Sequence, residues 1–200
     1  MIQLLFQNPQ IFVLVATALI LSISIHEFSH AFAANFLGDP TAKNMGRLTI
    51  NPKAHLDPTG TVFLLLVGFG WGKPVPFNPV NLKNPKRDSA LISLAGPLSN
   101  LILATLLSLI LKFVPVGELI ATFLYTAILY NLMLGFFNLI PLGPLDGNKI
   151  MFGILPNKLA VQWVDFQRYG IYILMFLVFF RFIGRILGPL VDISMKILGL

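Results

Sequence analysis

The chain has 200 residues, of which 56% are hydrophobic and 11% charged, with a formal net charge of +6 and a mean hydropathy of +0.82. Several apolar stretches approach or exceed 20 residues, so the sequence predicts a multi-pass membrane protein and excludes a soluble domain. The absence of cysteine excludes disulfides, thiol catalysis and cysteine metal ligands. Basic residues gather in short loops, which indicates membrane topology and no nucleic-acid partner.

The first long helix is expected over 10–37, ending at Gly38-Asp39-Pro40, and its only ionisable side chains are His26, Glu27 and His30. Helix positions four apart share a face, so the two histidines can present ring nitrogens to one cation. This is the H-E-x-x-H spacing of zinc hydrolases, in which the glutamate acts as general base. A purely structural reading is weak, because a carboxylate in a membrane helix costs at least ~2.5–3.5 kcal/mol.

A re-entrant half-helix is expected next, within 57–80. Asp57 is placed as the N-cap and Pro58 as the first helical residue. The apolar run 61–67 is too short to cross a bilayer, and Gly68, Gly70 and Gly72 interrupt it. The chain should therefore return to the side from which it came, with its irregular backbone covered by protein or by a water-filled cavity.

The returning stretch, Gly72-Lys73-Pro74-Val75-Pro76-Phe77-Asn78-Pro79, has an uneven supply of backbone donors. In an extended strand the two internal prolines remove N–H groups from one edge, while Lys73, Val75 and Phe77 keep theirs on the other. This pattern predicts a short β-like edge that could pair with an extended guest peptide. A rigid proline-rich turn without a partner is an equally consistent interpretation.

Further spans are expected over 89–111, 119–140 and about 169–187. The last contains Arg181 and Arg185, interpreted as snorkelling arginines, and an interfacial helix over 188–200 follows it. The fold class is thus an all-α integral membrane bundle of about four full spans plus the re-entrant half-helix, in one domain over 1–200. Because basic residues cluster in alternate loops, the N-terminus is predicted outside and the site near the cytoplasmic side.

A catalytic zinc takes three protein ligands and keeps one open position. Among the remaining acids, Asp146 alone lies just beyond the inner end of a span, in a segment rich in proline and glycine. We therefore predict one Zn²⁺ per chain, bound by His26, His30 and Asp146. With Glu27 included, the formal charges sum to zero, which a low-dielectric interior tolerates. The same ligands would also accept other divalent ions.

Two motifs, His26-Glu27-Phe28-Ser29-His30 and Asn138 to Gly147, match H-E-x-x-H and N-x-x-P-x-x-x-L-D-G. The chain thereby resembles the site-2 protease family of intramembrane zinc metalloproteases. The resemblance extends to the G-x-x-x-N of Gly96 and Asn100 and to the stretches 55–58 and 72–76. The connection at 112–118 and the short C-terminus leave no room for the PDZ or CBS domains of some members.

The resemblance implies hydrolysis of peptide bonds in or beside a substrate's transmembrane helix, with Glu27 as general base. Asn138 or Asn100 would donate to the developing oxyanion, although Asn100 with Gly96 could equally serve helix packing. His55 is either a contact to the site or a satisfied loop histidine. The expected partners are a substrate transmembrane helix and the lipid bilayer, and the expected location is a prokaryotic cell membrane. A homo-oligomer or a separate regulatory protein is left open.

Two other functions fit some of these features. A divalent metal transporter would also place histidine and aspartate in membrane helices, but it needs polar residues along the whole pathway, and the outer halves of these spans have almost none. A non-catalytic relative that binds membrane helices would have no use for Glu27. The sequence names neither the substrate nor the cleavage site.

Overall fold

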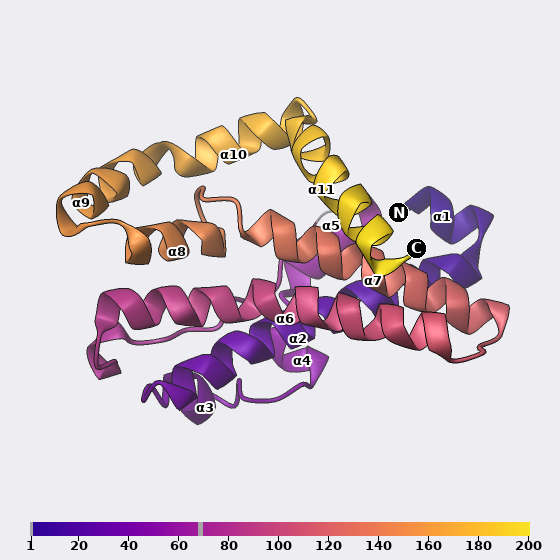
Figure 1. The fold of residues 1–200 in the computed structure, drawn as a ribbon, viewed down its shortest axis with the longest axis horizontal. Coiled ribbons are helices and arrows are strands. Elements are labelled where there is room, and N and C mark those ends of the chain that lie inside the picture. The colour runs from indigo at the N-terminus through magenta and orange to yellow at the C-terminus, as the bar shows by residue number, and fades with distance from the viewer. Residues whose placement is uncertain (1, 68–69) are drawn as a thin grey trace.

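The computed structural model describes residues 2–67 and 70–200 (Figure 1). Within these ranges the chain is helical and forms no β-strand, which confirms the all-α fold class. The α-helices are α1 (Ile2–Gln7), α2 (Pro9–Phe36), α3 (Thr41–Asn44), α4 (Pro52–His55), α5 (Pro58–Val67), α6 (Pro85–Phe113), α7 (Glu118–Asn138), α8 (Asp146–Ile154), α9 (Asn157–Phe166), α10 (Gly170–Phe179) and α11 (Phe182–Leu198). Two 3₁₀ turns span Pro79–Asn81 and Gln167–Tyr169.

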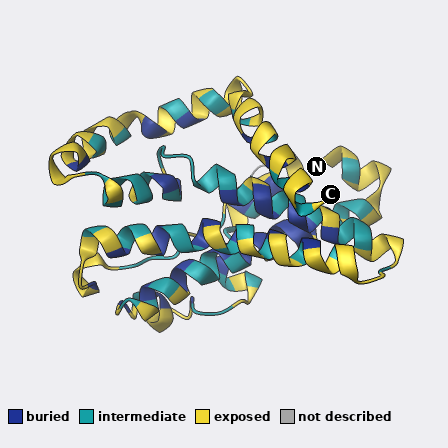
Figure 2. Ribbon diagram, in the orientation of Figure 1, coloured by how far each residue is buried: buried dark blue, intermediate teal, exposed yellow. Residues whose placement is uncertain are grey.

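Among the residues described, α2, α6 and α7 are each long and apolar enough to cross a membrane, and the bent run 157–179 with 182–198 passes the same test as one broken span. Helix α6 packs against both of the others and against α8, so it lies at the centre of the bundle (Figure 1). The core between α6 and α7 contains Ala104, Ile128 and Leu132. A second cluster joins α2 to α5 through Val15, Leu19, Ile23 and Leu64. In Figure 2 buried residues concentrate where these helices meet.

Helix starts follow the expected capping chemistry. The Asp57 carboxylate accepts a hydrogen bond from Gly60 N at 2.7 Å, and Pro58 is the first residue of α5, as predicted. Helix α6 begins at Pro85, about one turn before the expected start, because Asn84 takes the N-cap position. The Asp88 carboxylate reaches back to accept the Asn84 N–H at 2.8 Å, which satisfies the donor at the helix entry.

The segment after α5 turns back on itself. Gly68, one of the expected helix breakers, lies outside the described residues. Gly70 to Asn78 has no regular structure, and an antiparallel bridge pairs Gly72 with Leu56, just before the start of α5. The chain therefore returns to its point of departure, as expected of a re-entrant segment, but the β-like edge is limited to this isolated bridge.

The expected single span over about 169–187 is broken in the structure. Arg181 adopts a left-handed backbone conformation with φ 59°, and the helices on either side of it differ in direction by 77°. Because a left-handed residue ends a helix, α10 stops at Phe179. Helix α11 then runs through the boundary expected at residue 188 and packs on α7 with Val191 and Met195 buried, so the expected helix start at 188 is wrong, while its interfacial position stays a prediction.

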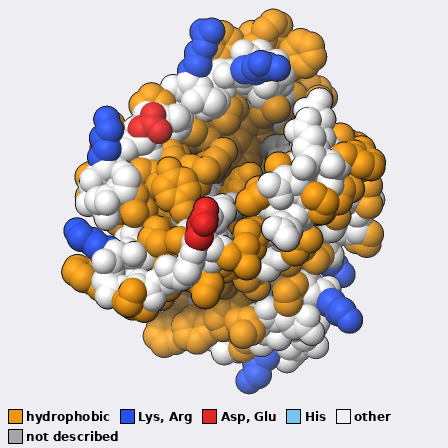
Figure 3. Space-filling model, turned by 90° about the vertical axis from the view of Figure 1, so that its right-hand side faces the viewer, with side chains coloured by type: hydrophobic (Ala, Val, Ile, Leu, Met, Phe, Trp, Pro, Cys, Tyr) orange, Lys and Arg blue, Asp and Glu red, His pale blue; other side chains and the backbone are white. Residues whose placement is uncertain are grey.

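The outward surface is largely apolar. Figure 3 shows one end of the molecule, where hydrophobic side chains cover most of the surface and line a central hollow, while charged side chains lie mainly near the margin. Large hydrophobic side chains are exposed on all three long helices, among them Phe32, Leu106 and Leu119. A bilayer can solvate such a surface, whereas water cannot do so cheaply.

Candidate metal centre and active site

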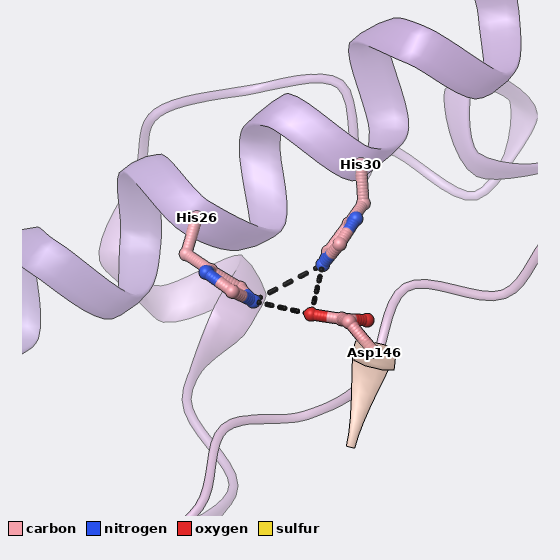
Figure 4. A group of neighbouring side chains, drawn as sticks. All are labelled: His26, His30 and Asp146. Atoms are coloured by element: carbon pink, nitrogen blue, oxygen red, sulfur yellow. Dashed lines mark hydrogen bonds and ion pairs between the residues drawn. The ribbon is translucent and has the colours of Figure 1, made fainter. Parts of the chain in front are cut away.

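Three potential metal ligands converge beside the centre of the bundle (Figure 4). His26 and His30 lie one turn apart on α2, and Asp146 is the first residue of α8, 120 residues further along the chain from His26. The Nε2 atoms of the two histidines are 3.1 Å apart. Asp146 Oδ2 lies 3.1 Å from the His26 nitrogen and 3.2 Å from the His30 nitrogen. The three atoms therefore form a nearly equilateral triangle.

The tautomer of each histidine follows from its other ring nitrogen. His30 Nδ1 lies 2.7 Å from the backbone oxygen of Ile92, which can only accept, so this nitrogen carries the proton. His26 Nδ1 lies 2.6 Å from Asn100 Oδ1, which is likewise an acceptor. Neutral rings protonated at Nδ1 present bare lone pairs at Nε2. While the rings are neutral, the Nε2 atoms cannot donate hydrogen bonds to one another or to the Asp146 carboxylate, and only a ring protonated at both nitrogens would do so.

Lone pairs on three facing ligand atoms repel one another, and either a proton on one ring or a metal ion between the three atoms removes that repulsion. Ligands at about 2.0–2.2 Å from a tetrahedral zinc lie roughly 3.3–3.5 Å apart. The observed separations of 3.1–3.2 Å are close to this value. Two imidazoles and one carboxylate are also a donor set that suits zinc and leaves a fourth position open. The residues present thus fit the predicted metal.

Gly96 on α6 provides the space for this arrangement. A Cβ atom at that position would lie 2.4 Å from His30 Nε2 and 2.7 Å from His26 Nε2, well inside van der Waals contact. Only glycine therefore allows the backbone of α6 to lie directly against both rings. The G-x-x-x-N pattern has a local explanation, since Gly96 makes room for the ligand atoms and Asn100, one turn later, binds the far side of His26.

Asn100 belongs to a buried amide network behind His26. Its Nδ2 donates to the backbone oxygen of Ser22 at 3.1 Å and to Asn131 Oδ1 at 2.7 Å. The Asn131 amide in turn donates to Ser22 Oγ at 2.8 Å and to Ala127 O at 2.8 Å. Because both donors of Asn100 are used and its oxygen faces Nδ1, it lies on the opposite side of the ring from the ligand atoms. In this structure Asn100 is engaged behind His26, and its predicted oxyanion role stays a prediction.

The other two predicted polar residues have hydrogen-bond partners outside the ligand triangle. Asn138 Nδ2 donates to Leu134 O within its own helix at 3.0 Å, which leaves no described contact to the site. His55 is fully buried and its Nε2 lies 2.6 Å from Thr49 O, as expected of a histidine whose hydrogen bonds are satisfied within its own loop. Neither side chain reaches His26, His30 or Asp146.

The Glu27 carboxylate faces the returning stretch and not its own helix. Its Oε2 accepts a hydrogen bond from the backbone N–H of Val75 at 3.0 Å. Its Oε1 lies beside Gly72, where a Cβ would approach to 3.6 Å. Helix α2 therefore carries the candidate ligands His26 and His30. On a neighbouring face of the same helix, the Glu27 carboxylate is held by the segment that returns after α5.

This arrangement corrects the predicted guest-peptide edge. The Lys73 N–H bonds to His55 O at 2.7 Å, and the Val75 N–H bonds to Glu27, so both donors face inward and are already used. The prediction that Lys73, Val75 and Phe77 offer free N–H groups to a substrate is therefore wrong for the first two. The alternation of donors was correct, but their direction depended on the tertiary contacts of the stretch.

Most of the chain matches a known family model. Residues 14–119 and 116–181 align with the model described as "Peptidase family M50". The chain belongs to peptidase family M50. This membership confirms the resemblance to the site-2 protease family, and together with the apolar helices it identifies a multi-pass membrane protein.

Curated relatives of this M50 chain come from bacteria and archaea. The chain is 42% identical over 171 residues to "Putative zinc metalloprotease YwhC" of Bacillus subtilis, covering 81% of this chain and 77% of that protein. It is 31% identical over 140 residues to "Zinc metalloprotease MJ0392" of Methanocaldococcus jannaschii, covering 70% of this chain and 34% of that protein. No solved structure matches the chain.

Sequence reasoning missed three residues that surround the centre of this M50 protein. Asn131 and Ser22 complete the network behind His26, and Arg47 binds the returning stretch from the other side. A partner for Asn131 could have been predicted, because an amide in the middle of an apolar span is costly unless it forms hydrogen bonds. The contact of Arg47 was not predicted, since a basic residue in a loop was interpreted only as a marker of membrane topology.

Proposed function

We propose that this chain is a zinc-dependent intramembrane endopeptidase that hydrolyses peptide bonds in or next to transmembrane helices of membrane proteins. Family membership and the printed names of the relatives support a zinc metalloprotease. The observation that carries the proposal is the convergence of three possible metal-ligand atoms, from His26, His30 and Asp146. Glu27 follows His26 directly in the chain, which places the general base of the H-E-x-x-H spacing on the same helix.

Each residue has a distinct role in this proposal. His26, His30 and Asp146 would hold one Zn²⁺ per chain, and the metal, when bound, supplies Lewis acidity toward a water molecule and a peptide carbonyl. Glu27 accepts the proton of the attacking water and delivers it to the leaving amine, as a general base and then a general acid. With Oε2 engaged by Val75, Oε1, which accepts no hydrogen bond from the described residues, is the atom that receives this proton.

The proposed substrate class follows from where these residues lie. His26 and His30 belong to a helix long enough to cross a bilayer, and the apolar surface around the bundle suits lipid. A peptide bond that reaches such a centre comes from another membrane segment. That segment must be unwound locally, because the peptide groups of an intact helix are hydrogen-bonded to each other and shielded. The proposed orientation keeps the N-terminus outside and the centre toward the cytoplasmic side of a prokaryotic cell membrane.

Metal content and cleavage, measured on the same purified samples, test the proposal. Wild type should contain about one zinc per chain and cleave a membrane-protein substrate. His30→Ala should lose both, while Glu27→Gln should keep the metal and lose cleavage. Zinc bound by wild type together with full cleavage by Glu27→Gln would contradict the mechanism. Zinc binding without any cleavage, but with metal flux across vesicles, would favour a transporter.

A further inference from the structure

We propose that Arg47 is a positioning residue for Glu27, and that it acts through the backbone of residues 72–77, here called the strap. The inference deepens the proposed hydrolysis and rests on Glu27 being its general base. Arg47 belongs to none of the recognised motifs and lies 20 residues after Glu27 in the chain. Its side chain is nevertheless only 4% exposed, which is unusual for an arginine and calls for a specific set of partners.

The partners of the Arg47 guanidinium are carbonyl groups of the strap. Nη2 donates to Lys73 O at 2.5 Å, and Nη1 donates to Pro74 O at 3.1 Å. Within the described residues Arg47 forms no ion pair, so these two carbonyls carry the contact. Charge-assisted hydrogen bonds of this kind are stronger than neutral ones, and losing them would leave a buried charge unsatisfied. The guanidinium therefore fixes the course of the strap.

His55 fixes the same part of the strap from a second direction. Its backbone oxygen accepts the Lys73 N–H at 2.7 Å, so Lys73 is held by both its donor and its acceptor. The ring donates from Nε2 to Thr49 O, which leaves Nδ1 as an acceptor 3.4 Å from Arg47 Nη2. Burial lowers the pKa of His55, and the nearby Arg47 charge lowers it further, so the ring stays neutral beside the guanidinium.

The strap so held presents one donor to Glu27. Pro74 and Pro76 have no N–H and fixed φ angles, so Val75 is the only donor of this rigid triplet. Its N–H donates to Glu27 Oε2 at 3.0 Å, and no other hydrogen bond reaches that carboxylate from the described part of the chain. The positive charge of Arg47 also attracts Glu27 over a longer distance. Arg47 thus determines where the carboxylate points without touching it.

Removing Arg47 should therefore slow the reaction with little effect on substrate binding or metal content. In Arg47→Gln we expect kcat to fall by about 10–100-fold, because a small displacement of a general base has a large effect on rate. KM should change by less than about threefold, since uniform substrate binding is unaffected. Arg47→Lys keeps the charge but not the forked geometry, and should restore part of the rate. Arg87→Gln, at an exposed position of α6, is the matched control.

A double-mutant cycle tests whether Arg47 acts through Val75. Val75→Pro removes the N–H from an extended position between two prolines, and should lower kcat as Arg47→Gln does. If both act on the same hydrogen bond, the double variant should be about as slow as the slower single variant. Additive losses would overturn the inference, as would a Val75→Ala variant, which keeps the N–H, that is as slow as Val75→Pro. A rise in kcat in Val75→Pro would mean that the strap obstructs Glu27.

Hydrogen exchange gives a measurement that does not depend on activity. Deuterium uptake by peptides covering residues 72–77 should increase in Arg47→Gln and in Glu27→Ala, while uptake by α6 stays as in wild type. Unchanged uptake in both variants would overturn the inference even in an active enzyme. If uptake rises as expected but zinc-loaded wild type cleaves nothing, the strap contact stands and the proposed hydrolysis fails.

Discussion

Asn131, together with the backbone oxygen of Ser22, determines which atom of Asn100 faces His26. Its Oδ1 accepts from Asn100 Nδ2 at 2.7 Å, so the amide oxygen of Asn100 points to His26 Nδ1 at 2.6 Å. An amide without this partner could turn over and present an N–H to the ring, which would move the imidazole proton to Nε2. Asn100 and Asn131, which lie behind the His26 ring and not among the ligand atoms, therefore favour the tautomer in which His26 Nε2 is available to a metal.

Asn131→Leu should weaken zinc binding without removing a ligand. Loss of a residue that orients a metal-bound histidine typically costs about 10–100-fold in metal affinity, and we expect an effect in this range. Titration against a competing chelator measures it. Thr105→Val is the control, because Thr105 is an exposed residue of α6 whose hydroxyl donates to Leu101 O of its own helix. Equal affinities for Asn131→Leu and wild type would refute the role of the network.

Gly96→Ala should disturb the centre sterically. The added methyl group would lie 2.4 Å from His30 Nε2, so either α6 or the histidine must move. We expect lower zinc content and a loss of stability of about 1–3 kcal/mol, the usual range for overpacking. Thermal unfolding with and without zinc measures both effects. Gly184→Ala is the matched control, because no atom lies within 4 Å of a Cβ at that position of α11. A Gly96→Ala protein with wild-type zinc content would show that the rings have room.

Zinc should stabilise the folded chain, and a chelator should lower its melting temperature. At a free zinc concentration of 100 times Kd, binding to the folded state alone contributes about 2.7 kcal/mol. Asp146→Asn should lose most of the zinc-dependent shift in melting temperature, because an amide is a poor zinc ligand. Asp165→Asn should retain it, since Asp165 pairs with Arg168 at the exposed surface. A full zinc shift in Asp146→Asn would exclude Asp146 as a ligand.

Asp39 should make stability depend on pH near the end of α2. Burial raises the pKa of its carboxyl, but hydrogen bonds from Thr41, Asn81 and Asn78 outweigh burial and hold that pKa below its ordinary value. The folded pKa lies below the unfolded value of about 3.9, so the contribution is present above pH ~4 and is lost as pH falls through the folded pKa.

Asp39→Asn should therefore unfold more easily than wild type at pH 7, while the difference between the two should shrink below pH ~4. Chemical unfolding in detergent at both pH values measures the difference. Asp192→Asn, an exposed position on α11, serves as the control for a change in net charge. A constant difference between Asp39→Asn and wild type at all pH values would show that ionisation of Asp39 is not involved.

Local patterns in the sequence were sufficient for much of the fold. Length and apolarity identified the helices that became α2, α6 and α7, because a membrane span depends on its own residues. Asp57 and Pro58 identified the start of α5, since capping involves only the first turn. The break at Arg181 escaped prediction because the run 169–187 contains no proline or glycine between Gly170 and Gly184, so composition alone gave no reason for a helix to end there.

The sequence by itself determined the helical spans, the pairing of His26 with His30 and the presence of a carboxylate beside them, because four-residue spacing fixes which side chains share a helical face. Only the tertiary structure decided what surrounds them. The surrounding groups come from segments far apart in the chain: the Asn131 amide, the Gly96 backbone and the strap held by Arg47. Contacts between distant segments cannot be predicted from a local sequence pattern. The direction of the Val75 N–H shows the difference most clearly: alternation told which residues have donors, but only the packing of the strap on α2 turned that donor toward Glu27.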